Sequence, residues 1–303
     1  MYKNYDEFIE NIRNKKIMFC GIGRSNLPFI DSLTQKNIPV TVYDSKQECN
    51  LNEKLVKQLK ENKFIDLRLH DESVWQEKND VIIRTPGMNF FCDKLLKAAE
   101  KGAIITSEME IFFDVCPCPI IGITGSDGKT TVSTLIYKML KSEGITTYLG
   151  GNIGSPLLTK VPKMKKSDIA VVELSSFQLI SMRRSPEIAV VTNISPNHLD
   201  VHKDMAEYID AKKQILLHQN AFSKAVLNFD NPETRKMKGI TRAKTVFFSR
   251  LNKLKNGIWL DDSGNIVMSD GKTDKIIINT SEIKIPGYHN IENYMAAIAA
   301  VSD

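Results

Sequence analysis

Short, continuous apolar runs recur along the first third of the chain and alternate with segments of helical periodicity. These runs are too short for helices and lie at 16–20, 40–43, 81–83 and 103–106. Continuous apolar runs are typical of strands that a parallel sheet buries on both faces. Asp93–Lys101, in contrast, carries apolar residues at helical spacing. Alternating strands and helices indicate an α/β fold, so residues 1–107 are expected to form a small Rossmann-like domain.

The same alternation continues in the rest of the chain, after a connection at 107–119. Buried strands are expected at 169–172, 188–191, 225–228 and 245–248. Helical spacing predicts helices at 132–140 and 205–217 and an alanine-rich helix at 294–301. Residues 257–285 alternate in polarity and contain Gly turns, which predicts β-hairpins. Residues 108–303 are therefore expected to form a second α/β domain with a mostly parallel sheet.

The stretch Pro119–Thr131 carries the strongest chemical signal. A short apolar run leads into a bend with glycine at 122, 125 and 128, and Lys129-Thr130-Thr131 opens the next helix. Glycines let backbone N–H groups close around phosphate oxygens, and a helix N-terminus adds the positive end of its dipole. In such loops the lysine reaches phosphate and the threonine hydroxyl contacts Mg²⁺. The strict pattern requires glycine at Ile123, so this is a variant spacing. It predicts a nucleotide site and a P-loop ATPase-like second domain.

The first domain carries an incomplete dinucleotide-binding fingerprint. Gly21-Ile22-Gly23 lies between a predicted strand and a predicted helix, and Asp44 ends the next strand, where an acid can bind a ribose hydroxyl. Asn26 stands where the third glycine belongs. The pattern therefore supports a Rossmann-like fold more than it supports NAD. Thr85-Pro86-Gly87 follows another strand, where α/β sheets bind ligands, although a simple loop is the plainer interpretation.

Polar side chains are expected to converge at one edge of the second sheet. Lys129, Glu173 and His198 each follow a predicted buried strand, and parallel strands end at the same edge. Glu173 is placed to ligate Mg²⁺ or water, with an ion-paired structural glutamate as the alternative. Lys212 lies among apolar residues of the helix at 205–217. That placement fits either a side chain whose ammonium reaches water or a desolvated amine with altered chemistry.

Composition narrows the class of protein. The 303 residues are 42% hydrophobic and 25% charged, an ordinary globular composition for which two domains are the natural expectation. The charge balance of 41 − 36 = +5 is mild and spread out, so nucleic acid is not indicated as a partner. No signal peptide or membrane span is visible, and the five scattered cysteines fit reduced thiols. A cytoplasmic monomer is expected.

Several motifs, in this order, resemble those of the Mur ligase family, and the resemblance covers nearly the whole chain. They are Gly-Ile-Thr-Gly-Ser-Asp-Gly-Lys-Thr-Thr at 122–131, Gly-Gly-Asn-Ile-Gly at 150–154, Glu-Leu-Ser-Ser-Phe-Gln at 173–178, Asn-Ile-Ser-Pro-Asn-His-Leu-Asp at 193–200, Tyr-Ile-Asp-Ala-Lys at 208–212 and His-Asn-Ile-Glu-Asn at 289–293. The motifs at 150–154 and 173–178 favour the member that uses D-glutamate over its paralogues.

The resemblance implies a role for each matching residue. The ATP site would comprise Gly125, Ser126, Asp127, Gly128, Lys129, Thr130, Thr131, Asn290 and Asn293. Catalysis would depend on Lys129, Glu173, His198 and Lys212, and Mg²⁺ would be held by Thr130, Glu173, His198 and Lys212. Lys212 matches a lysine that the family carbamylates, which turns a cation into an acid able to ligand metal. Asn290 and Asn293 would share one helical face, although Asn290 could instead cap that helix.

Substrate positions follow from the same resemblance. Residues expected to hold a UDP moiety are Ser25, Asp44, Ser45, Thr85 and Gly87. Asn152, Ser175 and Gln178 would line the sugar-peptide side. The incomplete fingerprint of the first domain is thereby reinterpreted as a site for uridine diphosphate instead of NAD.

The implied activity is an ATP-dependent amide ligase of peptidoglycan precursor synthesis that adds D-glutamate to UDP-N-acetylmuramoyl-L-alanine. The substrate carboxylate would attack the γ-phosphate of ATP to give an acyl-phosphate and ADP, and the amine of D-glutamate would then displace phosphate. The alternatives are another Mur-type or a folylpolyglutamate-type ligase, a non-catalytic ATP-binding module, or a dehydrogenase.

The sequence departs from the family pattern in two ways. Asp127 replaces the more usual Asn of the loop, and Asn197 replaces the more usual Asp before His198. A carboxylate beside triphosphate is unfavourable unless it faces Mg²⁺ or a basic side chain. The family also has a third, C-terminal domain that binds the amino-acid substrate. That domain is absent from these 303 residues, so this chain alone is expected to have little or no ligase activity.

Overall fold

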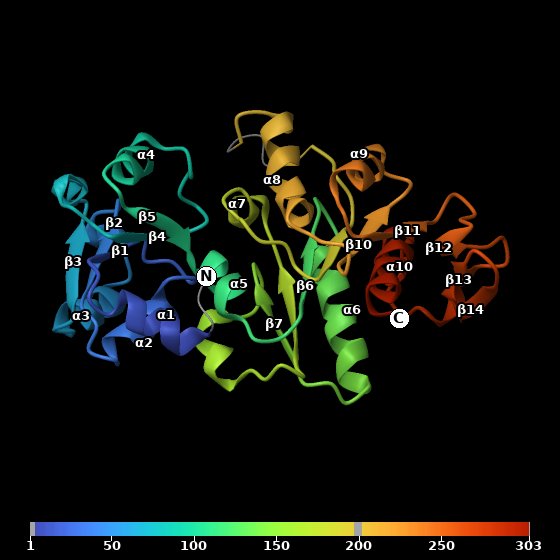
Figure 1. The fold of residues 1–303 in the computed structure, drawn as a ribbon, viewed down its shortest axis with the longest axis horizontal. Helices are drawn as coiled ribbons and strands as arrows, with labels where there is room; N and C mark the ends of the chain where they lie inside the picture. Colours follow the sequence, from blue (N-terminus) through green and yellow to red (C-terminus); the bar gives the residue numbers. More distant parts are fainter. Residues whose placement is uncertain (1–3, 197–201, 303) are drawn as a thin grey trace. The chain divides into compact units, whose positions relative to one another are not determined.

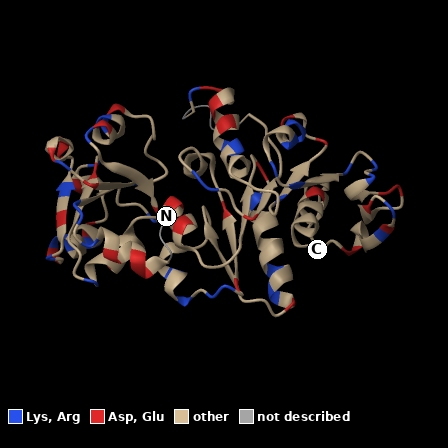
Figure 2. Ribbon diagram, viewed as in Figure 1, with Lys and Arg blue, Asp and Glu red and all other residues tan. Residues whose placement is uncertain are grey.

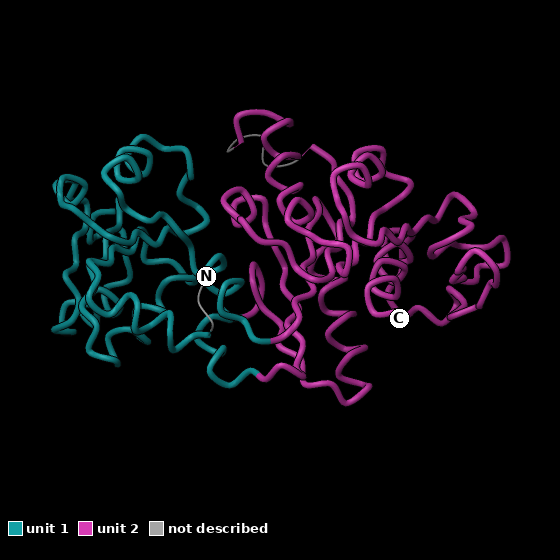
Figure 3. Tube along the Cα trace, in the orientation of Figure 1, with its two compact units in different colours: residues 1–117, 155–164 teal, residues 118–154, 165–303 magenta. Residues whose placement is uncertain are grey.

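The computed structural model describes residues 4–196 and 202–302. The chain forms two compact units (Figure 3): residues 1–117 with 155–164 make the first, and residues 118–154 with 165–303 make the second. The sequence predicted a domain boundary after residue 107 and a connection at 107–119. The two units of the structure divide within that predicted connection. The return of 155–164 to the first unit carries no signal in the sequence.

The first unit is built on a five-stranded parallel sheet in the order β3-β2-β1-β4-β5 (Figure 1). Its strands are β1 (Ile17–Cys20), β2 (Val40–Asp44), β3 (Ile65–Leu69), β4 (Val81–Arg84) and β5 (Ile104–Ser107). Its α-helices are α1 (Tyr5–Ile12), α2 (Leu27–Thr34), α3 (Glu53–Glu61), α4 (Asp93–Glu100) and α5 (Glu108–Val115). Its 3-10 turns are η1 (Glu48–Asn50), η2 (Glu72–Gln76) and η3 (Leu158–Lys163). The strand order is that of a Rossmann-like sheet, so the expected class is confirmed.

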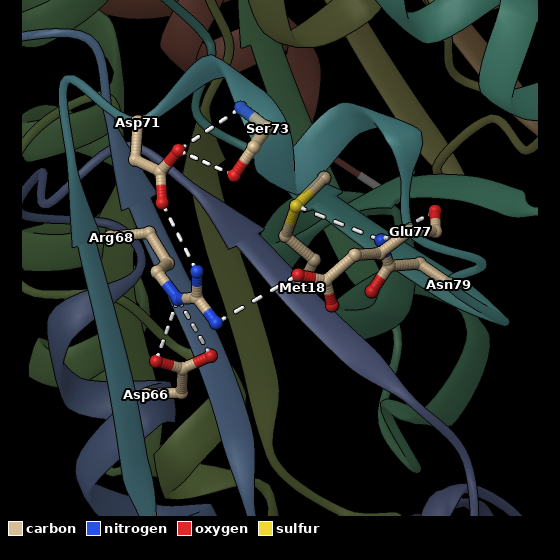
Figure 4. Close-up of polar contacts among 7 residues, drawn as sticks. All are labelled: Met18, Asp66, Arg68, Asp71, Ser73, Glu77 and Asn79. Carbon is tan, nitrogen blue, oxygen red and sulfur yellow. Dashed lines mark hydrogen bonds and ion pairs between the residues drawn. The ribbon is translucent and has the colours of Figure 1, made fainter.

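Strand β3 was not predicted; its residues alternate between apolar and charged, so it lacks the continuous apolar run by which the other strands of this unit were found. It is an edge strand, and its charged side chains face away from the core. Figure 4 shows Arg68 between the carboxylates of Asp66, 2.8 Å from Nε, and Asp71, 3.0 Å from Nη1. These partners raise the pKa of the Arg68 guanidinium. Charged pairs of this kind keep a sheet edge polar and discourage further strand pairing.

Buried Glu108 holds the returning segment 155–164 to the first unit. Ser107 caps α5, its hydroxyl accepting from the backbone N–H of Glu110. The carboxylate of Glu108 accepts from the backbone N–H of Leu158 at 3.0 Å, in a fully buried environment. Burial raises the pKa of the Glu108 carboxyl, whereas hydrogen bonds from the backbone N–H groups of Leu158 and Leu157 lower it. Burial has the larger effect, and the pKa is raised to about 7.

The second unit contains a nine-stranded sheet in the order β14-β13-β12-β11-β10-β9-β6-β8-β7. Its strands are β6 (Ile120–Thr124), β7 (Thr147–Gly151), β8 (Ile169–Glu173), β9 (Ile188–Val191), β10 (Lys224–Asn228), β11 (Lys244–Ser249), β12 (Asn256–Leu260), β13 (Asn265–Asp270) and β14 (Asp274–Asn279). The seven neighbouring strands β12-β11-β10-β9-β6-β8-β7 pair in parallel. Strands β12, β13 and β14 pair antiparallel. The mostly parallel sheet and the hairpins at 257–285 are therefore confirmed.

Two long helices cover one face of the central strands. The helices of this unit are α6 (Lys129–Ser142), α7 (Ser176–Leu179), α8 (Met205–Leu217), α9 (Pro232–Lys236) and α10 (Tyr288–Val301), with 3-10 turns η4 (Met237–Ile240) and η5 (Thr280–Glu282). Helices α6 and α10 lie side by side (Figure 1), and the alanines of α10 allow this close approach. Helix α6 packs against β6, β7 and β8, and α10 packs against β9, β10, β11 and β12, within one apolar cluster. Helices α7 and α8 contact each other elsewhere in the unit.

Charges of both signs are interspersed over both units (Figure 2). This distribution agrees with the mild net charge of +5. Over residues 4–196 and 202–302, the helices are too short or too polar to span a bilayer.

The pH dependence of the first unit's stability tests the buried state of Glu108. Between pH 4.5 and about 7 the folded unit keeps a proton that the unfolded chain releases, so stability falls as pH rises through this window. The loss is on the order of 3 kcal/mol. In Glu108→Gln this slope should vanish, which urea unfolding followed by Trp75 fluorescence in a Trp259→Phe background would measure.

The matched control is Glu100→Gln, which removes an exposed carboxyl of α4. It should keep the wild-type pH profile. Parallel profiles for Glu108→Gln and the wild type would contradict the raised pKa of Glu108.

Candidate functional site

The loop between β6 and α6 has the backbone that its glycines permit. Gly125 has φ +149° and Gly128, at the N-cap of α6, has φ +81°. A Cβ at Gly125 would lie 1.9 Å from Thr192 Oγ1, and one at Gly128 would lie 2.3 Å from Asn293 Oδ1. Only glycine fits either position. Backbone N–H groups of the first turn of α6 are therefore free of side-chain capping and face the bend.

The turn that follows β9 braces this loop. The Thr192 hydroxyl donates to the Asp127 carbonyl at 2.6 Å, and the Asp127 N–H donates to Asn193 Oδ1 at 2.9 Å. On the other side, Ser126 Oγ lies 2.9 Å from Tyr208 OH and donates to the Ser195 carbonyl at 2.9 Å. The loop shape is thus fixed by the turn after β9 and by Tyr208 of α8.

Two functional side chains of the loop already have partners. Lys129 Nζ donates to the carbonyls of Gly125 at 3.1 Å and Ser126 at 2.9 Å, so the ammonium lies over its own loop. Thr130 Oγ1 donates to Glu173 Oε2 at 2.7 Å, and Asn152 Nδ2 donates to Glu173 Oε1 at 2.9 Å. Strand β8 therefore delivers Glu173 to the start of α6, as the sequence predicts.

The oxygens of Thr130 and Glu173 fit a Mg²⁺ ion that is shared with phosphate. Mg²⁺ takes hard oxygen ligands and is usually held by one or two protein groups plus water and substrate phosphates. Within the described residues, no three His, Cys, Asp or Glu side chains gather into a closed metal site. The donor set thus suits an ion that arrives with a phosphorylated ligand. His198 lies outside the described residues.

Lys212 is a buried amine, which decides between the two interpretations of its sequence position. The residue is 2% exposed, and its Nζ donates to the Gly125 carbonyl at 2.8 Å and lies 4.7 Å from the Tyr208 ring centre. Burial, and then the charge of Lys129, lower the pKa of Lys212 to about 7, while Asp127 opposes this shift. Near neutral pH a large fraction of such a lysine is the uncharged, nucleophilic amine.

A cavity of about 560 Å³ lies beside the loop and against α10. Its lining comprises Asp127, Gly128, Thr131, Thr192, Asn193, Phe248, Ile285, His289, Asn290, Glu292 and Asn293. Asn293 Nδ2 donates to Asn290 Oδ1 at 3.2 Å, so the two asparagines share a helical face. Gly287, not Asn290, is the N-cap of α10, so the capping alternative is wrong. The cavity joins the loop to the two asparagines.

A separate cavity of about 540 Å³ lies in the first unit. It brings together Asp44, Ser45, Thr85 and Gly87, while Ser25 is not part of its lining. The Asp44 carboxylate accepts from the backbone N–H groups of Ile22 at 2.9 Å and Lys46 at 3.0 Å. The lining also includes two lysines that the sequence analysis missed, Lys46 and Lys94. Lysines are frequent on surfaces, and only the fold identifies these two.

The remaining sequence-predicted residues lie after β8. Ser175 and Gln178 form a capping box at α7, with Gln178 N donating to Ser175 Oγ at 3.3 Å and Ser175 N donating to Gln178 Oε1 at 3.0 Å. Their polar atoms thus shape the turn itself. His202, to which the sequence analysis gave no role, is buried next to this turn and contacts Ser176.

A Rossmann-like unit joined to an α/β unit with a phosphate-binding loop defines the class of this protein. The family model described as Mur ligase middle domain matches residues 123–301, which is more than half of the chain. The chain belongs to the Mur ligase family. The family resemblance expected from the motifs is thereby confirmed.

Named relatives agree with this placement. The chain is 46% identical over 306 residues to the UDP-N-acetylmuramoylalanine–D-glutamate ligase of Acetivibrio thermocellus, and 45% identical to that of Ruminiclostridium cellulolyticum. Both alignments cover 100% of this chain and 65% of the relative, so the chain spans about two thirds of their length.

A solved structure supports the fold. It is the UDP-N-acetylmuramate:L-alanyl-γ-D-glutamyl-meso-diaminopimelate ligase from Neisseria meningitides, with a TM-score of 0.60 and 18% identity. The match covers 94% of this chain and 92% of that one.

Exposed Asp127 should weaken the binding of polyphosphate to the loop. Its carboxylate is a like charge beside the phosphate cradle, so Asp127→Asn should tighten tripolyphosphate binding about three- to tenfold at low ionic strength. The gain should shrink in high salt, because screening weakens exposed charges. Calorimetric titration without divalent cations would measure both.

Asp262→Asn, which neutralises an exposed hairpin carboxylate, is the control and should leave affinity unchanged. Weaker binding by Asp127→Asn would show that the carboxylate supports the loop instead of opposing the anion.

Proposed function

We propose that this protein is an ATP-dependent ligase that joins D-glutamate to UDP-N-acetylmuramoyl-L-alanine in the cytoplasm, for peptidoglycan precursor synthesis. The convergence of Lys129, the Thr130–Glu173 pair and Lys212 on one phosphate-binding loop carries this proposal. Relatives that are 46% and 45% identical carry the name UDP-N-acetylmuramoylalanine–D-glutamate ligase, which supports the choice of D-glutamate.

The two cavities suit the two nucleotide-bearing substrates. The cavity beside the loop would hold ATP, with its phosphates over Lys129 and its base towards Asn290 and Asn293. The cavity of the first unit would hold the UDP moiety. The Asp44 carboxylate, which backbone N–H groups hold in place, suits a ribose hydroxyl, and the ammonium groups of Lys46 and Lys94 suit a diphosphate.

The chain's own groups supply mainly positioning and charge. Lys129 would exchange the carbonyls of Gly125 and Ser126 for phosphate oxygens and stabilise the charge that develops during transfer. Thr130 and Glu173, with His198, would hold Mg²⁺, which neutralises phosphate charge when bound. The substrate carboxylate gains the γ-phosphoryl group and ADP leaves; the amine of D-glutamate then attacks the acyl carbon, loses a proton and displaces phosphate.

Lys212 would act as a carbamate. The neutral form of this buried amine can add carbon dioxide and release one proton, which turns an uncharged group into an anion; starting from the ammonium form, two protons are released. An anion at this position removes the repulsion from Lys129 and adds an oxygen donor near the loop. The charge change thus suits a site that must gather metal and phosphate.

The direct test is ADP release by the natural full-length protein with UDP-N-acetylmuramoyl-L-alanine, ATP, Mg²⁺ and a panel of amino acids. We expect turnover with D-glutamate and a loss of at least about a hundredfold in Lys129→Met, because one charge-stabilising donor of the transition state is removed. Lys138→Met, an exposed lysine on the same helix, is the control. Turnover with another amino acid alone would overturn the substrate assignment.

A second experiment tests the carbamate. Lys212→Ala should lose activity, and formate or acetate should restore part of it by supplying the missing carboxylate oxygens. Lys213→Ala removes the neighbouring amine, which pairs with Asp210, and should retain activity. Full activity of Lys212→Ala without added acid would refute the role.

A further inference from the structure

Three side chains outside the assigned site form a hydrogen-bonded series. His202 Nε2 lies 2.8 Å from Ser176 Oγ, and His202 Nδ1 lies 2.9 Å from Glu207 Oε1. Ser176 is 2% exposed and His202 is 4% exposed. In the tautomer in which Nδ1–H donates to the Glu207 carboxylate, Nε2 accepts from the Ser176 hydroxyl.

The imidazole also packs between two aromatic rings. Phe177 is stacked on it, with ring centroids 4.9 Å apart and planes 2° apart. Tyr208 meets it edge-on at 5.4 Å and 66°. His202 therefore fixes the turn that begins α7 against the first turns of α8.

This packing reaches the phosphate-binding loop through Tyr208. The Tyr208 hydroxyl lies 2.9 Å from Ser126 Oγ, and the Tyr208 ring lies below the ammonium of Lys212. Ser176 follows Glu173 by three residues on the same chain segment. One imidazole is thus in contact with the segments that carry Glu173 and Lys212, and Tyr208 links it to Ser126 of the loop.

The order serine, histidine, carboxylate is also that of a nucleophilic triad, but the surroundings do not suit one. A nucleophile must be reachable by its substrate. Ser176 is buried, and neither of the cavities described above includes it in its lining. The geometry is that of a brace whose polar atoms are satisfied internally.

We propose that His202 is a positioning residue, which holds the Ser175–Gln178 turn to α8 and keeps Tyr208 under Lys212 and against the loop. The proposal rests on the proposed function only where ligase turnover is the readout. Its action is on the transition state, since small displacements of reacting groups reduce rates strongly. The adenine side of the site, at α10, is not in contact with this series.

The experiment compares His202→Gln with His218→Gln, an exposed histidine at the end of the same helix α8. In the natural full-length protein, His202→Gln should lower kcat about tenfold or more and change the KM for ATP less than about twofold. Ser176→Ala should act in the same direction, and the double variant should be no worse than the stronger single one. Effects that multiply, or a His202→Gln variant equal to His218→Gln, would overturn the proposal.

A chemical readout keeps the test independent of ligase activity. Acetic anhydride labelling of Lys212, followed by mass spectrometry with Lys213 as internal standard, should be about threefold faster or more in His202→Gln, because Tyr208 no longer shields the amine. An unchanged labelling ratio would contradict the positioning role of His202, whether or not the wild type releases ADP. The absence of ADP release would by itself refute only the ligase function. Labelling of Ser176 by a fluorophosphonate probe would show a nucleophile instead.

Discussion

The carbonyl oxygen of Gly125 accepts hydrogen bonds from two ammonium groups, those of Lys129 and Lys212. Two like charges that share one acceptor repel each other, and a partly buried environment screens this repulsion less than bulk water does. This repulsion contributes, after burial, to the lowered pKa of Lys212. Three events would reduce the repulsion between these two ammonium groups. They are the loss of a proton from Lys212, a modification that changes the charge of Lys212, and the binding of an anion at the loop.

The surrounding sheet makes this constraint possible. Strands β9, β6 and β8 are neighbours at the centre of the second unit, and their carboxyl ends supply the Thr192–Asn193 turn, the loop and Glu173. Because β6 lies between the other two, the loop is held from both sides. A glycine at position 125 is what lets Thr192 approach so closely. The gathering of charged side chains around the loop is thus a consequence of the strand order and of the glycine at position 125.

Much of this arrangement could be predicted from the sequence, for identifiable reasons. Strands β6, β8 and β9 are buried on both faces and leave continuous apolar runs. Strand β3 escaped prediction because an edge strand needs only one apolar face. The position of Lys212 in sequence left two interpretations open, and only the packing of α8 against the loop shows a buried amine.

Other features leave no local trace. His202 and Ser176 are 26 positions apart, and Ser126 and Tyr208 are 82 apart. Neither pair falls in a periodic pattern, since such contacts depend on the whole fold. The return of 155–164 to the first unit depends likewise on a carboxylate 50 positions away. Periodicity in the sequence predicts individual helices and strands. These contacts also depend on how the helices and strands pack against one another in the fold.

The long separations of these contacts bear on how the site obtains its chemistry. Ser126 and the backbone of Asp127 are fixed by residues 65 to 82 positions away. The environment that lowers the pKa of Lys212 therefore exists only once α8, β9 and the loop are packed together. In an unfolded chain the same lysine is solvated and has its ordinary basicity. Folding thus creates a reactive amine, and the brace at His202 and Tyr208 lies where that environment is maintained.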